Sequence, residues 1–363
     1  MTSPEASGVL TAEEVAASAA WIAAVQLPDG LIPWYPGGHA DPWNHVEAAM
    51  ALLVAGRREE AEAALRWLAR HQLPDGSWCT YYLADGVEDP RRDPNVTAYV
   101  ATGVWFHHLL TGDDSLLGEL WPTVEAAVGF VLRLQQPAGE VLWSLDADGA
   151  PGRYALLAGS SSILHSLRCA LGAARRLGDE RPDWELAAGR LAHALAWRPE
   201  RFERKDRWAM DWYYPVLSGA LDPAAGTARI EAGWARFVEE GLGVRCVSDR
   251  PWVTAAETAE CALALHALGR EAAAARLLAW TRHLRDPDGA YGTGCVHPEC
   301  VRFPGGERTT YSAAAVLLAS NALAGGRGAG MFRGEDLPAL TPLAAPSATT
   351  RGRPGATGPL GLA

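Results

Sequence analysis

A five-residue helix ending recurs along this chain. The segment QLPDG occupies residues 26–30 and returns at 72–76, and the variants QQPAG and RDPDG follow at 135–139 and 285–289. Each ends a run rich in Ala and Leu, and a Pro with a Gly close behind it stops a helix. The first two intervals are 46 and 63 residues, and the next 150 leave room for three units of about 50. The sequence therefore predicts repeated helical hairpins.

The apolar periodicity between these endings indicates twelve helices. They are expected near residues 11–27, 43–56, 58–71, 94–112, 114–135, 158–177, 182–197, 209–221, 226–241, 253–268, 270–284 and 309–324. Hairpins that each need a neighbour to bury a second face can close into a ring. We therefore expect an all-α fold, an (α/α)6 toroid of six helical hairpins.

The chain is predicted to hold one catalytic domain, residues 1–326, followed by a tail. Residues 327–363 are rich in Gly, Pro, Ala, Ser and Thr, a composition that favours disorder over a packed core.

Alternate helices of such a ring line its centre, and their first turns are unusually polar and aromatic. All six inner helices would begin at the same end of the ring. Twelve polar and aromatic side chains are expected to converge there: Asp41, Asn44, Glu47, Asn95, Tyr99, Ser160, Asp211, Tyr213, Tyr214, Glu257, Glu260 and Tyr311.

Two carboxylates on inner helices one and five would face each other across this end of the ring. Glycoside hydrolysis needs such a pair, separated by about 6.5–9.5 Å in inverting enzymes. The preferred catalytic pair is Asp41 with Glu257, and Glu260 and Glu47 are the substitutes. The alternatives are that Asp41 only caps its helix and that one of the two Glu residues only makes a first-turn contact.

Aromatic side chains near the helix endings suit a sugar ligand, because sugar faces stack on flat apolar rings. About half of them are expected to fill packing between hairpins instead. The predicted substrate-binding residues are Trp34, Tyr35, His39, Trp43, Asn44, His45, Tyr81, Asn95, Tyr99, Asp211, Trp212, Tyr213, Tyr214, Trp252 and Tyr311. Asp211 is also a further candidate for the catalytic pair.

Charge and composition limit the classes of molecule that the protein can bind. The net charge of −11 opposes binding to nucleic acid or anionic lipid, and no apolar run approaches the roughly 18 residues of a membrane span. The N-terminus lacks the pattern of a signal peptide, so a cytoplasmic location is expected. No cofactor is expected, and no metal, because Cys295, His297 and Cys300 offer only three close ligands.

The repeated QLPDG ending followed by Trp resembles the repeat of squalene cyclases and prenyltransferase β-subunits, which are α/α toroids. The segment DADG at 146–149 lacks the last Asp of the cyclase motif. Four segments, PWYPGGHADPWNHVEAAMAL, DPNVTAYVATGVW, DWYYPVLSGAL and TAAETAECALAL, are more similar to actinobacterial proteins often labelled prenyltransferase. These include the methylmannose polysaccharide hydrolases of mycobacteria.

That resemblance implies an α-1,4-endomannosidase acting on partly methylated mannan. It places acidic catalytic residues at Asp41 and at the turn that carries Glu257 and Glu260. Position 44 is Asn here, which cannot act as an acid or a base.

Three hypotheses follow from the sequence. The first is a glycoside hydrolase acting on an intracellular α-mannan-type oligosaccharide or polysaccharide. The second is a terpene cyclase or prenyltransferase-like enzyme, which would turn over isoprenoid diphosphates. The third is a non-catalytic glycan-binding toroid. The linkage, the anomeric outcome and the oligomeric state stay open.

Overall fold

The computed structural model describes residues 9–340. The helices are α1 (Ala12–Val25), α2 (Pro42–Val54), α3 (Arg58–His71), α4 (Pro94–Ala98), α5 (Val100–Thr111), α6 (Asp114–Arg133), α7 (Leu157–Leu177), α8 (Pro182–Trp197), α9 (Ala209–Leu217), α10 (Pro223–Phe237), α11 (Ala255–Ala267), α12 (Glu271–Ala279), α13 (Thr310–Leu323) and α14 (Gly330–Arg333). The strands are β1 (Tyr81–Leu83), β2 (Gly86–Asp89), β3 (Ala155–Leu156), β4 (Phe202–Glu203), β5 (Val238–Glu239), β6 (Gly243–Arg245), β7 (Trp252–Thr254), β8 (Gly292–Val296) and β9 (Val301–Arg308).

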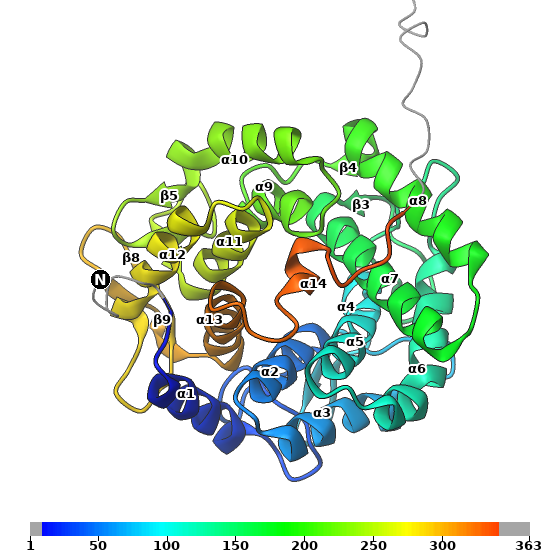
Figure 1. The fold of residues 1–363 in the computed structure, drawn as a ribbon, viewed down its shortest axis with the longest axis horizontal. Coiled ribbons are helices and arrows are strands. Elements are labelled where there is room, and N and C mark those ends of the chain that lie inside the picture. The colour runs from blue at the N-terminus through cyan, green and yellow to red at the C-terminus, as the bar shows by residue number, and fades with distance from the viewer. Residues whose placement is uncertain (1–8, 341–363) are drawn as a thin grey trace, which may run out of the picture.

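Helices α2, α5, α7, α9, α11 and α13 contact one another in cyclic order, and α13 closes the cycle by packing on α2 (Figure 1). Helices α1, α3, α6, α8, α10 and α12 each pack on the outside of an inner helix. Every helical run expected from the sequence is present, and the run at 94–112 is divided into α4 and α5 at Tyr99. The prediction of a helix-rich fold built from hairpins is confirmed.

The recurring helix ending is a hydrogen-bonded joint between neighbouring hairpins. Gln26 Nε2 donates to the carbonyl of Gly30 at 3.0 Å and to the carbonyl of Glu60, on the next outer helix, at 2.9 Å. Gly30 has φ +100°, and a Cβ there would lie 2.5 Å from the carbonyl oxygen of Ala63, so only glycine fits. The same pair of bonds is made by Gln72 to Gly76 and Thr123, and by Gln135 to Gly139 and Ala187.

The fold is not purely all-α, because five strands form an antiparallel sheet in the order β5-β6-β7-β8-β9. It is built from the long connections that lead into α11 and α13. Trp252 pairs with Val296 and Thr254 with Gly294. The helical signal around these segments concealed them, since they are short and interrupted by Gly and Pro. Strand β7 of this sheet ends at Thr254, directly before α11 begins. The sheet therefore lies beside the site described below.

The structure also differs from the expected boundary of the tail. Residues 327–340 are folded, and helix α14 lies over the centre of the ring (Figure 1). Met331 Sδ lies 3.9 Å from Cys169 Sγ on α7, and Phe332 packs on Phe106 of α5. A prediction based on the average composition of the segment does not detect these two apolar side chains, and so it missed this folded part. Residues 341–363, the rest of the predicted tail, lie outside the described residues.

We expect Met331→Ala to lower the free energy of unfolding by about 2–5 kcal/mol, the usual cost of truncating a buried Met. Met331 is 0% exposed, whereas an unattached tail would tolerate the change. Chemical denaturation measures the difference, and Glu335→Ala, an exposed position in the same segment, is the control. Equal stability of Met331→Ala and the parent protein would contradict the packing of α14.

Among the described residues, α6 is the one helix long and apolar enough to cross a membrane by length and composition. It packs as an outer helix on α4, α5 and α7. Its Glu119 pairs with Arg66 of α3 at 2.9 Å, as expected for a surface helix of a folded domain.

Candidate active site

The first turns of the inner helices meet at one end of the ring, and α14 covers the other end. Contacts between side chains connect these turns in space: Tyr99 of the α4–α5 junction reaches Glu47 of α2, and Tyr213 and Tyr214 of α9 reach Glu260 of α11. We call this end of the ring the mouth. Its carboxylates are Asp41, Glu47, Glu257 and Glu260.

Asp41 is the N-cap of α2 and is 5% exposed. Its Oδ1 accepts the backbone N–H of Asn44 at 3.0 Å, and its Oδ2 accepts Trp34 Nε1 at 2.6 Å and Asn44 Nδ2 at 2.7 Å. Burial raises the pKa of Asp41, while these three donors favour its ionised form and act against that rise. Asp41 therefore caps its helix and also places a carboxylate with three protein hydrogen-bond donors at the mouth.

Glu257 lies in the first turn of α11, directly after β7. It accepts a hydrogen bond from the hydroxyl of Thr254, the last residue of that strand. Burial raises the pKa of Glu257 above its ordinary value of 4.5. With one hydroxyl donor against the three donors of Asp41, Glu257 is the better placed of the two to carry a proton.

Glu47 and Glu260 form a second carboxylate pair, one helical turn further into the ring than Asn44 and Glu257. Glu47 Oε1 accepts Trp43 Nε1 at 2.9 Å and the hydroxyl of Tyr99 at 3.2 Å. Burial and the charge of Glu260 raise the pKa of Glu47 well above 4.5, and burial is the main cause that raises the pKa of Glu260 to about 7. Because like charges in one buried site cannot both ionise easily, we infer that this pair shares a proton near neutral pH.

Both oxygens of Glu260 are held by tyrosines. The hydroxyl of Tyr214 donates to Oε1 at 2.9 Å, and the hydroxyl of Tyr213 donates to Oε2. Their rings lie 5.3 Å apart. Glu260 therefore anchors the middle of α9 against α11.

We expect Glu260→Gln to flatten the pH dependence of stability. A carboxyl whose pKa is raised on folding stabilises the fold fully below its unfolded pKa, and this stabilisation is lost as the pH rises through its folded pKa. For Glu260 the window runs from 4.5 to about 7. Each pKa unit is worth about 1.4 kcal/mol, so the loss is at most about 3 kcal/mol. Urea denaturation across this range checks it. Parallel pH curves for the parent protein and the variant would contradict the expectation.

Asp93 was missed by the sequence prediction. It is the N-cap of α4, and its Oδ1 accepts the backbone N–H of Asn95 at 2.7 Å. Burial, and to a smaller extent the charge of Asp41, raise the pKa of Asp93 to about 6. A sequence signal existed, because Asp41-Pro42 and Asp93-Pro94 repeat the same cap and first helical residue at the start of successive inner helices.

Aromatic side chains surround Asp41. The ring of Trp34, whose Nε1 reaches Asp41, meets His39, Tyr81 and Tyr311 edge-on at centroid distances of 4.4, 5.8 and 5.2 Å. His39 stacks on Tyr81 and pairs with Glu88 at 3.0 Å. These predicted binding residues are therefore brought together.

A second aromatic group lies beside Glu47. Trp43 is 5.5 Å from Tyr99 and 5.7 Å from Tyr214 between ring centroids. The indole N–H of Trp43 is bound to Glu47, so its ring is fixed while remaining partly exposed.

Two predicted binding residues are used elsewhere. His45 is fully buried, with Nδ1 accepting the backbone N–H of Ile32 and Nε2 bonded to the carbonyl of Ala64, and burial lowers its pKa to about 4. Trp212 is buried, donates to the carbonyl of Arg229 and stacks on Phe237. Both side chains lie in the packing between helices, with their polar atoms bonded to the backbone, although their neighbours in sequence reach the site. The structure therefore gives His45 and Trp212 structural contacts.

Asp211 stands apart from the four carboxylates. Its Oδ1 accepts the backbone N–H of Ala158 at 3.1 Å. Burial raises the pKa of Asp211, and the positive charge of Arg229 partly opposes this rise. Tyr35 lies 6.3 Å from His39 between ring centroids, and Trp252 stacks on Phe303 of the sheet at 4.6 Å. Within residues 9–340, no hydrogen bond joins these three residues to the four carboxylates of the mouth.

The segment with zinc-like residue types forms a hairpin of the sheet. Cys295 is in β8, and His297 pairs with Glu239 at 3.5 Å. Within residues 9–340, no group of three or more His, Cys, Asp or Glu side chains is placed to hold a metal ion.

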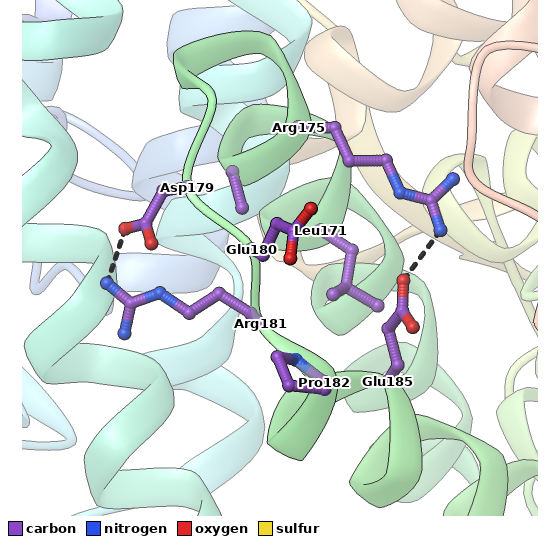
Figure 2. Close-up of a pocket in the computed structure, with 8 residues that line it drawn as sticks. Leu171, Arg175, Asp179, Glu180, Arg181, Pro182 and Glu185 are labelled. Carbon is purple, nitrogen blue, oxygen red and sulfur yellow. Dashed lines mark hydrogen bonds and ion pairs between the residues drawn. The ribbon is translucent and has the colours of Figure 1, made fainter.

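A hollow of about 320 Å³ on the outside of the ring, where α7 ends and α8 begins, is a poor candidate for the site (Figure 2). Arg181 pairs with Asp179 at 2.5 Å, and Arg175 pairs with Glu185 at 2.7 Å. Its arginines are thus neutralised by carboxylates within the hollow itself, as the dashed lines in Figure 2 show.

The carboxylates at the mouth differ in the number of hydrogen bonds they accept, and aromatic rings surround them. A site of this kind is suited to glycoside hydrolysis. The comparisons with known proteins agree. The chain is 51% identical over 336 residues to the MMP endo-(1,4)-3-O-methyl-alpha-D-mannosidase of Mycolicibacterium hassiacum, a match that covers 92% of this chain and 93% of the relative. The chain belongs to the family of this mannosidase and is a glycoside hydrolase.

Solved structures of lower identity share the fold. A glycosidase in complex with glucose matches with a TM-score of 0.68 at 19% identity, covering 89% of this chain and 99% of that one. The GH63 mannosylglycerate hydrolase of Thermus thermophilus in complex with glucose matches with a TM-score of 0.69 at 15% identity, covering 84% and 99%. A D-mannose isomerase matches with a TM-score of 0.65 at 12% identity, covering 85% of this chain and 96% of that one. No protein-family model matches the chain.

Proposed function

We propose that this protein is an endo-acting α-mannosidase that cleaves 1,4 linkages in a mannan carrying 3-O-methyl groups. The observation that carries the proposal is the set of buried carboxylates among aromatic rings at the mouth, in a chain that shares half its residues with a mannosidase of that name. We assign the catalytic pair within this set to Asp41 and Glu257. The proposal places the enzyme in the cytoplasm, and its chemistry requires no metal or organic cofactor.

The scaffold of this proposal is an (α/α)6 toroid, with the five-stranded sheet as an addition to one side of its mouth. The cyclic contacts of the six inner helices support this description. The prenyltransferase-like part of the resemblance contributes no residue to the reaction.

In the proposed reaction, Glu257 is the general acid. Burial raises its pKa, which favours the protonated form, and in this role it gives a proton to the oxygen of the bond that breaks. Asp41 is the ionised partner on the other side of the anomeric carbon. It either takes the proton of a water that attacks this carbon or bonds to the carbon itself and is then displaced by water, so that a bond to water replaces the glycosidic bond. The indole of Trp34 and the amide of Asn44 hold Asp41 in orientation.

Glu47 and Glu260 are positioning residues in this scheme. They fix Trp43, Tyr99, Tyr213 and Tyr214 through the hydrogen bonds described above. Their shared proton removes one negative charge from the mouth, so that Asp41 faces one ionised carboxylate of this pair rather than two.

The test is incubation of the protein with α-1,4-mannooligosaccharides, 3-O-methylated and unmethylated, with products followed by NMR. The expected result is internal cleavage, and the first anomer to appear gives the stereochemical outcome. The double variant Asp41→Ala plus Glu257→Ala is the control, and unchanged activity in it would contradict the assignment. Oligosaccharide binding without any cleavage would support the non-catalytic alternative instead.

A further inference from the structure

A small cavity of about 180 Å³ adjoins the carboxylates where α2, α4, α7 and α9 begin. Most of its wall is apolar and comes from Trp43, Val141, Trp143, Leu156, Ile163 and Met210. Trp43 lines the cavity and also donates to Glu47, so one indole ring borders both the cavity and the mouth.

Two buried polar atoms of the wall lack a partner within the described residues. Asn95 Oδ1 and Ser160 Oγ make no hydrogen bond there, and their residues are 6% and 2% exposed. Buried polar groups are normally paired, so these two atoms suit the hydroxyl groups of a bound sugar. Asp93 also lines the cavity, but its Oδ1 already accepts two backbone N–H groups of α4.

The size of the cavity limits what it can take. Pockets for drug-sized ligands measure roughly 300–1,000 Å³, so 180 Å³ accommodates part of one sugar unit rather than a stretch of glycan. An apolar wall with two hydrogen-bonding atoms fits a sugar face on which an ether methyl lies beside free hydroxyls.

We propose that this cavity is a specificity subsite that accepts an O-methyl group of the substrate and so makes the enzyme prefer methylated over unmethylated mannan. The inference rests on the proposed function and adds the residues that read the methyl group. A methyl ether buries apolar surface against Trp143, Ile163 and Met210, whereas a hydroxyl in the same place loses its hydrogen bonds to water.

Two variants alter the cavity in different ways. A Cβ on Gly159 would lie 3.6 Å from Asn95 Cβ and 3.7 Å from Leu156 Cβ, both ordinary contacts, so Gly159→Leu extends from a tolerated position between two wall residues and fills the space. Met210→Gln keeps the length of the side chain and makes the wall polar. The matched control is Gly118→Leu in α6, where a Cβ meets nothing within 4 Å.

The measurement is the ratio of kcat/KM for 3-O-methylated over unmethylated α-1,4-mannooligosaccharides of equal length. We expect about 10–200-fold for the parent protein, the usual discrimination of one methylene in an apolar pocket. Both cavity variants should lower the ratio at least several-fold, and Gly118→Leu should leave it unchanged. An unchanged ratio in both cavity variants would overturn the proposal.

A binding experiment separates failure of this proposal from failure of the proposed function. If neither oligosaccharide is cleaved, the proposed function is wrong, and NMR titration with 3-O-methylmannose and mannose then tests the cavity alone. Tighter binding of 3-O-methylmannose that is lost in Gly159→Leu supports the subsite. Equal affinity of the parent protein for the two sugars overturns it.

Discussion

Replacing Glu257 with Gln is expected to lower kcat on mannooligosaccharides by about 10²–10⁴-fold, the usual contribution of a general acid. The amide cannot deliver a proton, whereas burial raises the pKa of this carboxyl and so favours its protonated form. The hydroxyl of Thr254, which donates to Glu257, can donate equally to an amide oxygen. The fold should therefore be retained. Initial rates with the methylated oligosaccharide measure the effect.

The leaving group distinguishes a lost acid from a disturbed site. An aryl mannoside leaves with little help from an acid, so Glu257→Gln should cleave it with a much smaller loss than the oligosaccharide. Glu185→Gln, in the first turn of the outer helix α8, is the matched control and should be fully active. Equal losses on both substrates would place the acid elsewhere, with Glu260 as the next candidate.

Asp41→Asn is expected to lower kcat by a similar factor, about 10²–10⁴-fold, but without regard to the leaving group. Asn is as good an N-cap as Asp, so α2 should keep its start while the negative charge beside the anomeric carbon is lost. Rates with both substrates measure the effect, and thermal unfolding verifies that the helix start is intact.

The control for Asp41→Asn repeats the same cap on an outer helix. Asp222 precedes Pro223 and accepts the backbone N–H groups of Ala224 and Ala225, so Asp222→Asn makes an identical change away from the mouth. It should have normal activity. A substantially active Asp41→Asn protein would remove Asp41 from the catalytic pair.

The helices could be predicted from sequence because they depend on local signals. Thr11 and Glu14 form a capping box at the start of α1, and each Gln-x-Pro-x-Gly ending carries its own positive-φ glycine. The sheet β5–β9 could not be predicted in the same way. Its strands are only two to eight residues long, and its two parts, β5–β7 and β8–β9, are joined by pairing across about 40 residues of chain, as Val253 pairs with Cys295.

The candidate site was predictable as far as helix starts mark it. Asp41, Glu47, Glu257 and Glu260 all lie at or near the first turns of inner helices, and helix periodicity assigns those turns to one end of the ring. Which face of a turn a side chain occupies was less predictable. His45 and Trp212 each lie within one or two residues of a site residue. The ring nitrogens of both nevertheless form hydrogen bonds to backbone groups of neighbouring segments, away from the site.

The segment that ends in α14 determines how a polymer can approach. Since Met331 and Phe332 cover the end of the ring opposite the carboxylates, a glycan cannot thread through the centre from one side to the other. A polymer cut internally must lie across the rim, with both ends in solvent and only a few units dipping toward Asp41 and Glu257. Release of both fragments then needs no travel along a tunnel, and each cut is an independent encounter.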